Sequence, residues 1–158
     1  MKPNSEPRIA FFAGSFDPFT AGHASVVDRA LPLFDKIVIG IGVNAAKSAD
    51  ADTERRADAI RRLYAGTGGR VEVLVFSGSL AVDAARRAGA RWLLRGVRSV
   101  KDFEYERDMA DINRRLAGIE TILLPALPEL GAVSSSLVRE LSAYGCDVTP
   151  FLPHNPGI

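Results

Sequence analysis

Short apolar runs alternate along this chain with longer stretches in which apolar residues recur at helical spacing. The apolar runs are rich in β-branched residues and predict strands over residues 9–13, 37–43, 71–76, 92–94 and 121–124. The helical spacing predicts helices over residues 23–34, 53–64, 80–88, 102–116 and 134–144. Strands that are apolar throughout and alternate with helices are typical of a parallel sheet covered on both faces. We therefore expect a doubly wound α/β fold with a parallel five-stranded sheet, in a single domain over residues 1–158.

The composition is that of a domain that folds by itself. Hydrophobic residues make up 47% of the chain and charged residues 25%, which is average for globular chains and excludes disorder. No linker of Gly, Ser or Pro divides the sequence, although about residues 1–7 form a polar N-terminal extension. Pro32 falls near the end of the first predicted helix. Because proline lacks a backbone donor, we expect it to kink or close the last turn.

Charge and cysteine content narrow the classes of partner. The 20 Lys and Arg residues nearly balance the 19 Asp and Glu residues, so the net charge of +1 creates no field that would attract nucleic acid or an anionic membrane. The single cysteine, Cys146, can form no internal disulfide and offers no thiolate cluster for zinc. No run approaches the roughly 20 apolar residues of a membrane span, and the N-terminus lacks the apolar stretch of a signal peptide. We expect a cytoplasmic protein that binds neither nucleic acid nor membrane.

The densest chemical signal is the loop that leaves the first strand and enters the first helix, AGSFDPFTAGH over residues 13–23. Ligands of parallel α/β sheets collect at the carboxyl ends of the strands, where this loop begins. Gly14 allows the backbone to approach a ligand closely, Ser15 offers a hydroxyl, and Gly22 permits tight entry into a helix whose first N–H groups attract anions. His23 then lies in the first helical turn, with imidazole donors directed at the same site. A histidine at this position can also serve only to cap or pack the helix.

Three further segments place groups that bind phosphate at the same edge of the sheet. Arg95 and Arg98 flank Gly96 just after the fourth predicted strand, and guanidinium groups match phosphate oxygens in paired hydrogen bonds. Lys47 follows the second strand and supplies a mobile positive charge. Three consecutive serines, residues 134–136, open the last helix and offer hydroxyls and free N–H groups as well as an N-cap. Each pattern alone also fits an ordinary surface, but together they predict a polyphosphate site.

These segments together resemble the phosphopantetheine adenylyltransferase family of the T/HxGH nucleotidyltransferase superfamily. GSFDPFTAGH matches the first motif of the superfamily, and Lys47, RGVRSVKDFEYE, Asn113 and VSSSLVRE follow in the family's order, from about Ile9 to Pro153. The resemblance implies a Rossmann-like nucleotidyltransferase fold and the transfer of AMP from ATP to 4′-phosphopantetheine, with Mg²⁺, to give dephospho-coenzyme A and pyrophosphate. It also implies a homohexamer and feedback binding of coenzyme A.

The resemblance further implies roles for single residues. Ser15, Lys47 and Arg95 would hold the acceptor phosphate, the chain near Ala81 would line the pantetheine arm, and His23 would stabilise the transition state. ATP would lie against Ser15, Phe16, His23, Gly96, Val97, Arg98, Glu106, Leu130, Gly131, Ala132, Val133, Ser134, Ser135 and Ser136. No residue of the chain is assigned to a metal. Because a phosphate monoester is already a nucleophile at neutral pH, positioning and charge stabilisation suffice, with Lys47, Arg95 and His23 as the catalytic groups.

Two segments depart from the family pattern. SADADTERR, after Lys47, lacks the usual phenylalanine and paired acidic residues, and PALPELGAV, over residues 125–133, lacks an aromatic residue. Two alternative functions stay open. One is another nucleotidyltransferase, such as a cytidylyltransferase or a nicotinamide mononucleotide adenylyltransferase, against which DFEYE and SSSLVRE argue. The other is a non-catalytic protein that binds a nucleotide or coenzyme A, against which the presence of His23, Lys47 and Arg95 argues.

Overall fold

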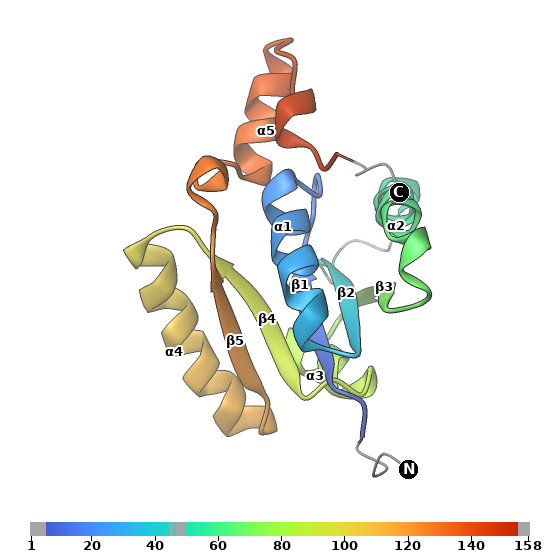
Figure 1. Cartoon of the computed structure of the whole chain (residues 1–158), viewed down its shortest axis with the longest axis vertical. Coiled ribbons are helices and arrows are strands. Elements are labelled where there is room, and N and C mark those ends of the chain that lie inside the picture. Colours follow the sequence, from blue (N-terminus) through green and yellow to red (C-terminus); the bar gives the residue numbers. More distant parts are fainter. Residues whose placement is uncertain (1–5, 45, 47–49, 155–158) are drawn as a thin grey trace.

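The computed structural model shown in Figure 1 describes residues 6–44, 46 and 50–154, and its centre is a sheet of five strands. The strands are β1 (Ile9–Gly14), β2 (Lys36–Val43), β3 (Val71–Ser77), β4 (Trp92–Val97) and β5 (Glu120–Pro125). They lie in the order β3-β2-β1-β4-β5, and every neighbouring pair is parallel. The predicted five-stranded parallel sheet is therefore confirmed. The chain reverses its direction of travel across the sheet between β1 and β4, which is where ligands bind in folds of this kind.

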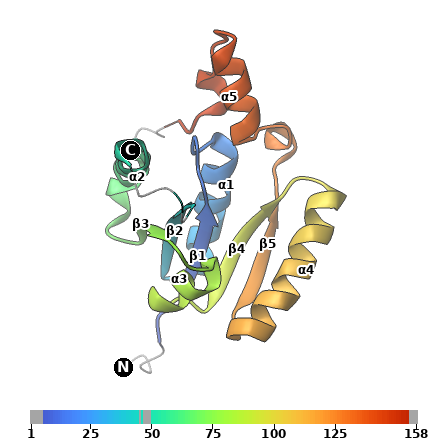
Figure 2. The same ribbon diagram turned by 180° about the vertical axis from the view of Figure 1, so that it is seen from behind.

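Helices cover both faces of the sheet, as Figures 1 and 2 show from opposite sides. They are α1 (Ala21–Ala30), α2 (Ala51–Leu63), α3 (Ala81–Arg87), α4 (Val100–Ala117) and α5 (Ser135–Ala143). The buried residues of α1 and α2 pack into one core cluster, and those of α3 pack into the other together with the end of α4. This arrangement confirms the doubly wound fold.

The two cores arise because successive residues of each strand point to opposite faces. Phe11 packs with α3 on one face, whereas its neighbour Phe12 packs with α1 and α2 on the other, and both are buried. Gly40 of β2 lies beside the Phe11 ring, and a Cβ at this position would be only 2.2 Å from it. The glycine therefore makes room for the fully buried Phe11 ring in the second core.

Most element boundaries differ from the sequence-based expectation by one or two residues, and two ends differ by more. The first helix spans 21–30 rather than 23–34, and a 3-10 turn over Leu31–Leu33 follows it. Pro32 lies in that turn, which confirms that it closes the helix. The fourth strand continues to Val97 rather than stopping at residue 94, because Arg95 and Gly96 pair with β5. Apolarity alone could not show that a strand continues through an arginine.

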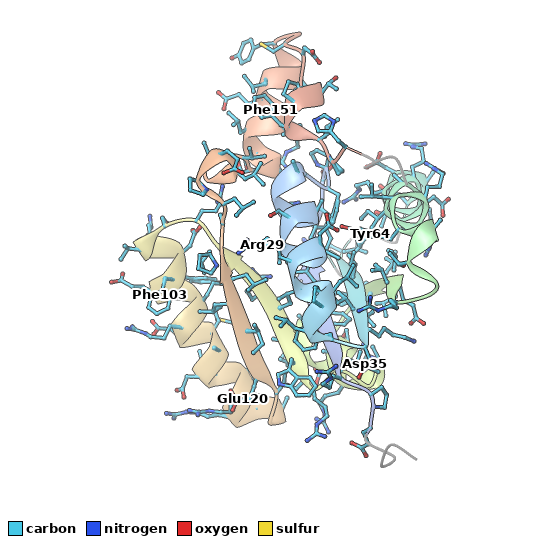
Figure 3. The ribbon with its side chains drawn as sticks, in the orientation of Figure 1. Arg29, Asp35, Tyr64, Phe103, Glu120 and Phe151 are labelled. Atoms are coloured by element: carbon cyan, nitrogen blue, oxygen red, sulfur yellow. The ribbon has the colours of Figure 1, made fainter. Side chains whose placement is uncertain are left out.

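The α5 helix lies beyond the carboxyl ends of the strands, above α1 in Figure 1. Side-chain contacts join neighbouring elements at both ends of the sheet. Arg29 of α1 donates to the Pro125 carbonyl at the end of β5 at 2.8 Å, and Arg8 pairs with Asp35 at 3.2 Å just before β2 (Figure 3). No helix among the described residues is both long and apolar enough to cross a membrane.

Candidate functional site

The loop between β1 and α1 turns sharply at Phe16, whose φ of 47° lies in the left-handed region. The Phe16 ring is buried and packs edge-on against Phe12 and Phe19, with ring centroids 5.1 and 5.3 Å apart. These contacts hold a conformation that disfavours a non-glycine residue by about 1–3 kcal/mol. Gly14 has to lack a side chain, since a Cβ there would lie 2.9 Å from the Phe16 ring. The buried aromatic rings thus fix the path of the loop that carries Ser15.

A reciprocal pair of hydrogen bonds begins α1 and fixes the ring of His23. The Thr20 N–H donates to His23 Nδ1 at 2.9 Å, and the His23 N–H donates to Thr20 Oγ1 at 3.3 Å. This is a capping box in which histidine takes the place usually held by Glu or Gln. Because Nδ1 accepts the backbone N–H, the proton of the neutral ring lies on Nε2. His23 therefore offers one donor, Nε2–H, and not the several donors that the sequence suggested.

Burial and nearby positive charge keep the His23 imidazole neutral. The ring lies among Phe12, Phe16 and Phe19, with centroids 5.0–6.1 Å away. Desolvation, followed by the positive charges of Arg95 and Arg98, lowers the pKa of His23 from 6.5 to about 4. At neutral pH the ring acts as a hydrogen-bond donor and not as a cation.

Arg95 and Glu106, both assigned to ligands from the sequence, bind each other. Arg95 Nε lies 3.0 Å from Glu106 Oε2, and Nη2 lies 2.8 Å from Oε1. Arg95 Nη1 donates to the Ala13 carbonyl at 2.8 Å. Glu106 is only 8% exposed, so the pair fixes the guanidinium firmly at the end of β1. Of the five N–H groups of the guanidinium, three make these bonds, and the others can still donate to a phosphate.

Arg98 is held between α4 and the segment that leads to α5. Its backbone N–H donates to Asp102 Oδ2 at 3.0 Å, and its Nε lies 3.4 Å from the same oxygen. Its Nη1 donates to the Val133 carbonyl at 3.4 Å. The side chain is 42% exposed, so it can turn part of its guanidinium toward a ligand.

The serines at the start of α5 bond chiefly within the protein. Ser134 is the N-cap, and its Oγ accepts the backbone N–H of the residue three positions later at 3.1 Å. Ser135 Oγ donates to the Pro18 carbonyl at 2.8 Å, and Ser136 Oγ accepts from Arg139 at 3.3 Å. The groups of this segment that stay available to bind an anion are chiefly the first backbone N–H groups of α5, at the positive end of the helix dipole.

These elements enclose a cavity of about 440 Å³ at the carboxyl ends of β1 and β4. The residues assigned from the sequence that line it are Ser15, Phe16, His23, Arg95, Gly96, Arg98, Glu106, Leu130, Val133, Ser134 and Ser135. Those that do not line it are Ala81, Val97, Gly131, Ala132 and Ser136. Lys47 lies outside the described residues, so its role stays a prediction. Asp102 and Tyr105 also line the cavity. The sequence argument did not single them out, although both lie in the quoted segment DFEYE.

A second cavity of about 290 Å³ adjoins the first and contains Ala81. The two cavities share Ala13, Arg95, Tyr105 and Glu106 as lining residues. The rest of the second wall is mainly apolar and comes from α3, α4 and the strands β1, β4 and β5: Phe11, Leu80, Ala81, Val82, Leu93, Met109, Ala110, Ile112, Asn113, Leu116 and Thr121. The ion pair of Arg95 and Glu106 thus lies at the junction of a phosphate-binding space and an apolar one.

The carboxylates of the site are engaged by arginines and not grouped as metal ligands. Asp102 pairs with Arg98 and Glu106 with Arg95. Within residues 6–44, 46 and 50–154, no group of three His, Cys, Asp or Glu side chains could hold a metal ion. The arrangement suits a chain of phosphates, with cations, one neutral N–H donor and a helix N-terminus around it.

The fold and this site define a nucleotidyltransferase of the cytidylyltransferase-like class, whose family model matches residues 11–141. A phosphopantetheine adenylyltransferase from Phocaeicola vulgatus is 54% identical over 146 residues, which cover 92% of this chain and 95% of that protein. Another, from Porphyromonas gingivalis, is 51% identical over 153 residues, which cover 97% of this chain and 96% of that protein. The chain belongs to the phosphopantetheine adenylyltransferase family.

Solved structures share the fold at much lower identity. A bifunctional NMN adenylyltransferase/ADP ribose pyrophosphatase from Francisella tularensis matches with a TM-score of 0.69 at 16% identity, over 95% of this chain and 46% of that one. A proposed nicotinate-nucleotide adenylyltransferase from Vibrio parahaemolyticus gives a TM-score of 0.65 at 15% identity, over 94% of this chain and 88% of that one. At such identity the likeness concerns the fold, and it confirms the nucleotidyltransferase architecture.

Proposed function

We propose that this chain transfers AMP from ATP to the phosphate of 4′-phosphopantetheine, giving dephospho-coenzyme A and pyrophosphate in coenzyme A biosynthesis. Family membership at 51–54% identity supports this reaction. The observation that carries it is the position of Arg95, which lines both the phosphate-binding cavity and the apolar cavity at Ala81. An acceptor with an uncharged arm and a terminal phosphate would lie across this junction, with its phosphate at Arg95.

The two substrates would meet where the two cavities join. ATP would occupy the larger cavity, with its phosphates near Arg98 and the N-terminus of α5, and with those of the other assigned residues that line the cavity around it. The acceptor phosphate would lie near Ser15 and Arg95, and Lys47 is proposed to reach the same phosphate. Glu106 lines both cavities and accepts hydrogen bonds from two nitrogens of Arg95. Its proposed role is therefore to orient the Arg95 guanidinium toward the ligands.

The reaction is a direct displacement at the α-phosphorus of ATP. An oxygen of the acceptor phosphate forms a new bond to this phosphorus, while the bond from the phosphorus to the oxygen that bridges to the β-phosphate breaks. Pyrophosphate leaves with the electron pair of that bond. The acceptor oxygen is already ionised at neutral pH, so no base has to remove a proton. The chain aligns the two reactants and stabilises the developing charge through Arg95 and His23 Nε2–H.

The remaining features of the function rest on the sequence and on family resemblance. We propose that Mg²⁺ enters bound to ATP, as part of the substrate, because the cavity carboxylates Asp102 and Glu106 both pair with arginines. We propose a cytoplasmic location from the sequence. We propose a homohexamer and feedback binding of coenzyme A from the resemblance to the family.

Pyrophosphate release with a panel of substrates tests the proposal. ATP or CTP would be combined with 4′-phosphopantetheine, pantetheine or nicotinamide mononucleotide, and Arg95→Ala would serve as a control for contaminating activity. Only ATP with 4′-phosphopantetheine is expected to react. Pantetheine lacks the phosphate that Arg95 would hold, and nicotinamide mononucleotide lacks the uncharged arm that would fill the apolar cavity at Ala81. The preference for ATP over CTP is expected from family membership. Comparable release with nicotinamide mononucleotide or with CTP would favour another nucleotidyltransferase. Binding of ATP without release from any acceptor would favour a non-catalytic binding protein.

A further inference from the structure

The helix α2 sends one arginine into the loop that follows β1. Arg56 Nη1 donates to the Ser15 carbonyl at 2.5 Å, across 41 positions of sequence. Its side chain is only 20% exposed, although arginines on a helix surface are usually well solvated. Nothing in the family resemblance assigns Arg56 a role, so its burial against the phosphate loop calls for a physical reason.

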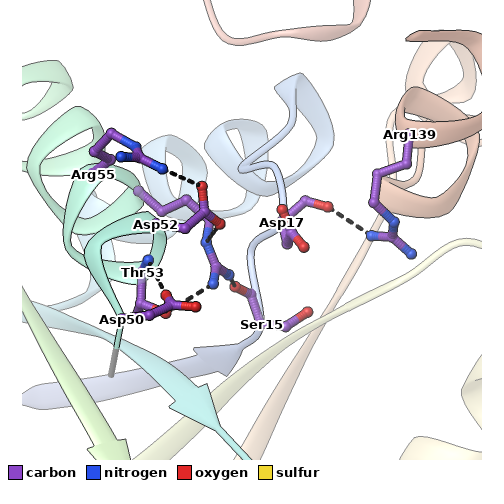
Figure 4. Close-up of polar contacts among 8 residues, drawn as sticks. Ser15, Asp17, Asp50, Asp52, Thr53, Arg55 and Arg139 are labelled. Atoms are coloured by element: carbon purple, nitrogen blue, oxygen red, sulfur yellow. Dashed lines mark hydrogen bonds and ion pairs between the residues drawn. The ribbon is translucent and has the colours of Figure 1, made fainter. Parts of the chain in front are cut away.

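A chain of hydrogen bonds braces this guanidinium from behind. Arg56 Nη2 donates to Thr53 Oγ1 at 3.0 Å, and Thr53 Oγ1 in turn donates to Asp50 Oδ1 at 3.0 Å. Asp50 also caps α2 by accepting the Thr53 N–H at 2.9 Å. Arg56 Nε lies 3.5 Å from Asp52 Oδ2. Figure 4 shows Asp50, Asp52 and Thr53 facing the Ser15 loop. The N-terminus of α2 and the loop are therefore joined by one network.

The Ser15 carbonyl belongs to the same peptide unit as the Phe16 N–H. In a trans peptide the C=O and N–H bonds point in opposite directions. A carbonyl held against α2 therefore turns the Phe16 N–H away from α2, and both residues line the phosphate-binding cavity. Among the described residues, the hydrogen bonds include none from the Phe16 N–H. That group is a backbone donor of the kind that binds phosphate.

We propose that Arg56 is a positioning residue, which holds the peptide unit between Ser15 and Phe16 so that the Phe16 N–H faces the phosphates. A second arginine supports the loop from the opposite side. Arg139 of α5 donates to the Asp17 carbonyl at 2.6 Å (Figure 4). Arg56 holds the peptide unit between Ser15 and Phe16, which both line the cavity. Arg139 holds the peptide unit that follows Asp17. The inference rests on the proposed function for its kinetic test, but not for its binding test.

The chain offers a matched control in the neighbouring arginine. Arg55 lies on the same helix and pairs with the same Asp52 at 3.2 Å, but its side chain is 73% exposed. We expect Arg56→Gln to lower kcat/KM for pyrophosphate release by about ten- to a hundredfold, since a misplacement of about 1 Å can slow a reaction a hundredfold. Arg55→Gln should stay within about twofold of wild type. Arg56→Lys should recover part of the loss, because the ammonium can donate to the carbonyl without the planar fork.

The readouts separate positioning from mere stability. Rates are expressed per folded molecule, and melting temperatures are measured for each variant. Thr53→Val removes the hydrogen bonds that join Arg56 Nη2 to Thr53 Oγ1 and Thr53 Oγ1 to Asp50, and it leaves Arg56 in place, so it should lower kcat/KM less than Arg56→Gln does. If Arg56→Gln does not fold, this variant tests the positioning role of Arg56 in its place. Calorimetric titration with ATP should show weaker binding to Arg56→Gln than to Arg55→Gln. If the glutamine variants agree within twofold in both rate and ATP affinity, the inference is overturned. Wild-type inactivity with 4′-phosphopantetheine would refute the proposed function instead, and the ATP titration would then decide on Arg56 alone.

Discussion

Replacing His23 by glutamine should separate the cap of α1 from the donor that faces the cavity. Glutamine is a usual residue at this capping position, and its side-chain oxygen can accept the Thr20 N–H that His23 Nδ1 now accepts at 2.9 Å. The free energy of unfolding at neutral pH should therefore change little. His23→Ala, in contrast, should lower it by about 1 kcal/mol, because the Thr20 N–H loses its acceptor while the bond from the N–H of residue 23 to Thr20 Oγ1 remains.

The effect of His23→Gln on catalysis should be much larger. Loss of one preorganised donor to developing charge typically lowers turnover by about a hundred- to a thousandfold, or about 2.7–4 kcal/mol. Pyrophosphate release at saturating ATP and 4′-phosphopantetheine measures the turnover, and calorimetry measures ATP affinity, which should change little. Thr20→Val is a control that weakens the cap and leaves the imidazole in place. Full turnover in His23→Gln would show that the imidazole has no catalytic part.

The stability of the same variant in acid provides a second, independent test. The pKa of His23 is about 4 in the folded protein and 6.5 when unperturbed, so between these values the unfolded chain binds more protons. The free energy of unfolding therefore falls as the pH falls through this window. Relative to neutral pH, the loss from His23 should be about 2 kcal/mol at pH 5 and about 3 kcal/mol at pH 4.

Urea denaturation at pH 7 and pH 5 measures this difference. Because glutamine does not titrate, His23→Gln should lose about 2 kcal/mol less than wild type between these two pH values. If the two proteins lose stability in parallel, the imidazole is not the partly buried neutral group that its surroundings indicate.

Other variants test the rest of the site and the core. Arg95→Ala should weaken 4′-phosphopantetheine more than ATP, and Arg98→Ala should do the reverse; calorimetric titrations that show no such difference would contradict the assignment. Arg95→Met should lower the free energy of unfolding by on the order of 3 kcal/mol, since it strands the Glu106 carboxylate. Urea denaturation of the double variant with Glu106→Met should show most of this stability regained without activity, and a double variant as unstable as the single one would argue against the pair. Gly40→Ala should lower the free energy of unfolding by about 1–3 kcal/mol, because its Cβ would lie 2.2 Å from the Phe11 ring. A melting temperature equal to that of wild type would show that the core yields there.

The sequence predicted the sheet and the general place of the site because both follow from local patterns. Apolar runs marked the five strands, and the residues that follow β1 and β4 had to meet at the reversal between those strands. The partners of individual side chains are not local. Glu106 and Arg95 are eleven residues apart, on a helix and a strand, so only packing could show that they pair.

The sequence raised capping of α1 only as an alternative to a chemical role for His23, and it could not show that one ring serves both. The known signature of a capping box carries Glu or Gln three residues after Ser or Thr, and here a histidine takes that place after Thr20. The contact of Arg56 with the Ser15 carbonyl could not be predicted from the sequence either. The α2 helix contains several arginines, and only the tertiary structure shows which one contacts the loop.

The wall of the phosphate-binding cavity combines charges that are permanent with a ring that is uncharged. Guanidinium groups remain protonated in proteins, and the His23 imidazole, with a pKa of about 4, stays neutral and keeps its Nε2–H throughout the range near neutrality. The dianion of a phosphate monoester, in contrast, takes up a proton near pH 6, or about one unit below neutrality. A decline in rate on the acid side of neutrality would therefore record the ionisation of the substrate and not of these residues. An acceptor with a more acidic phosphate would then extend the working range into more acidic solution, although the protein itself is unchanged.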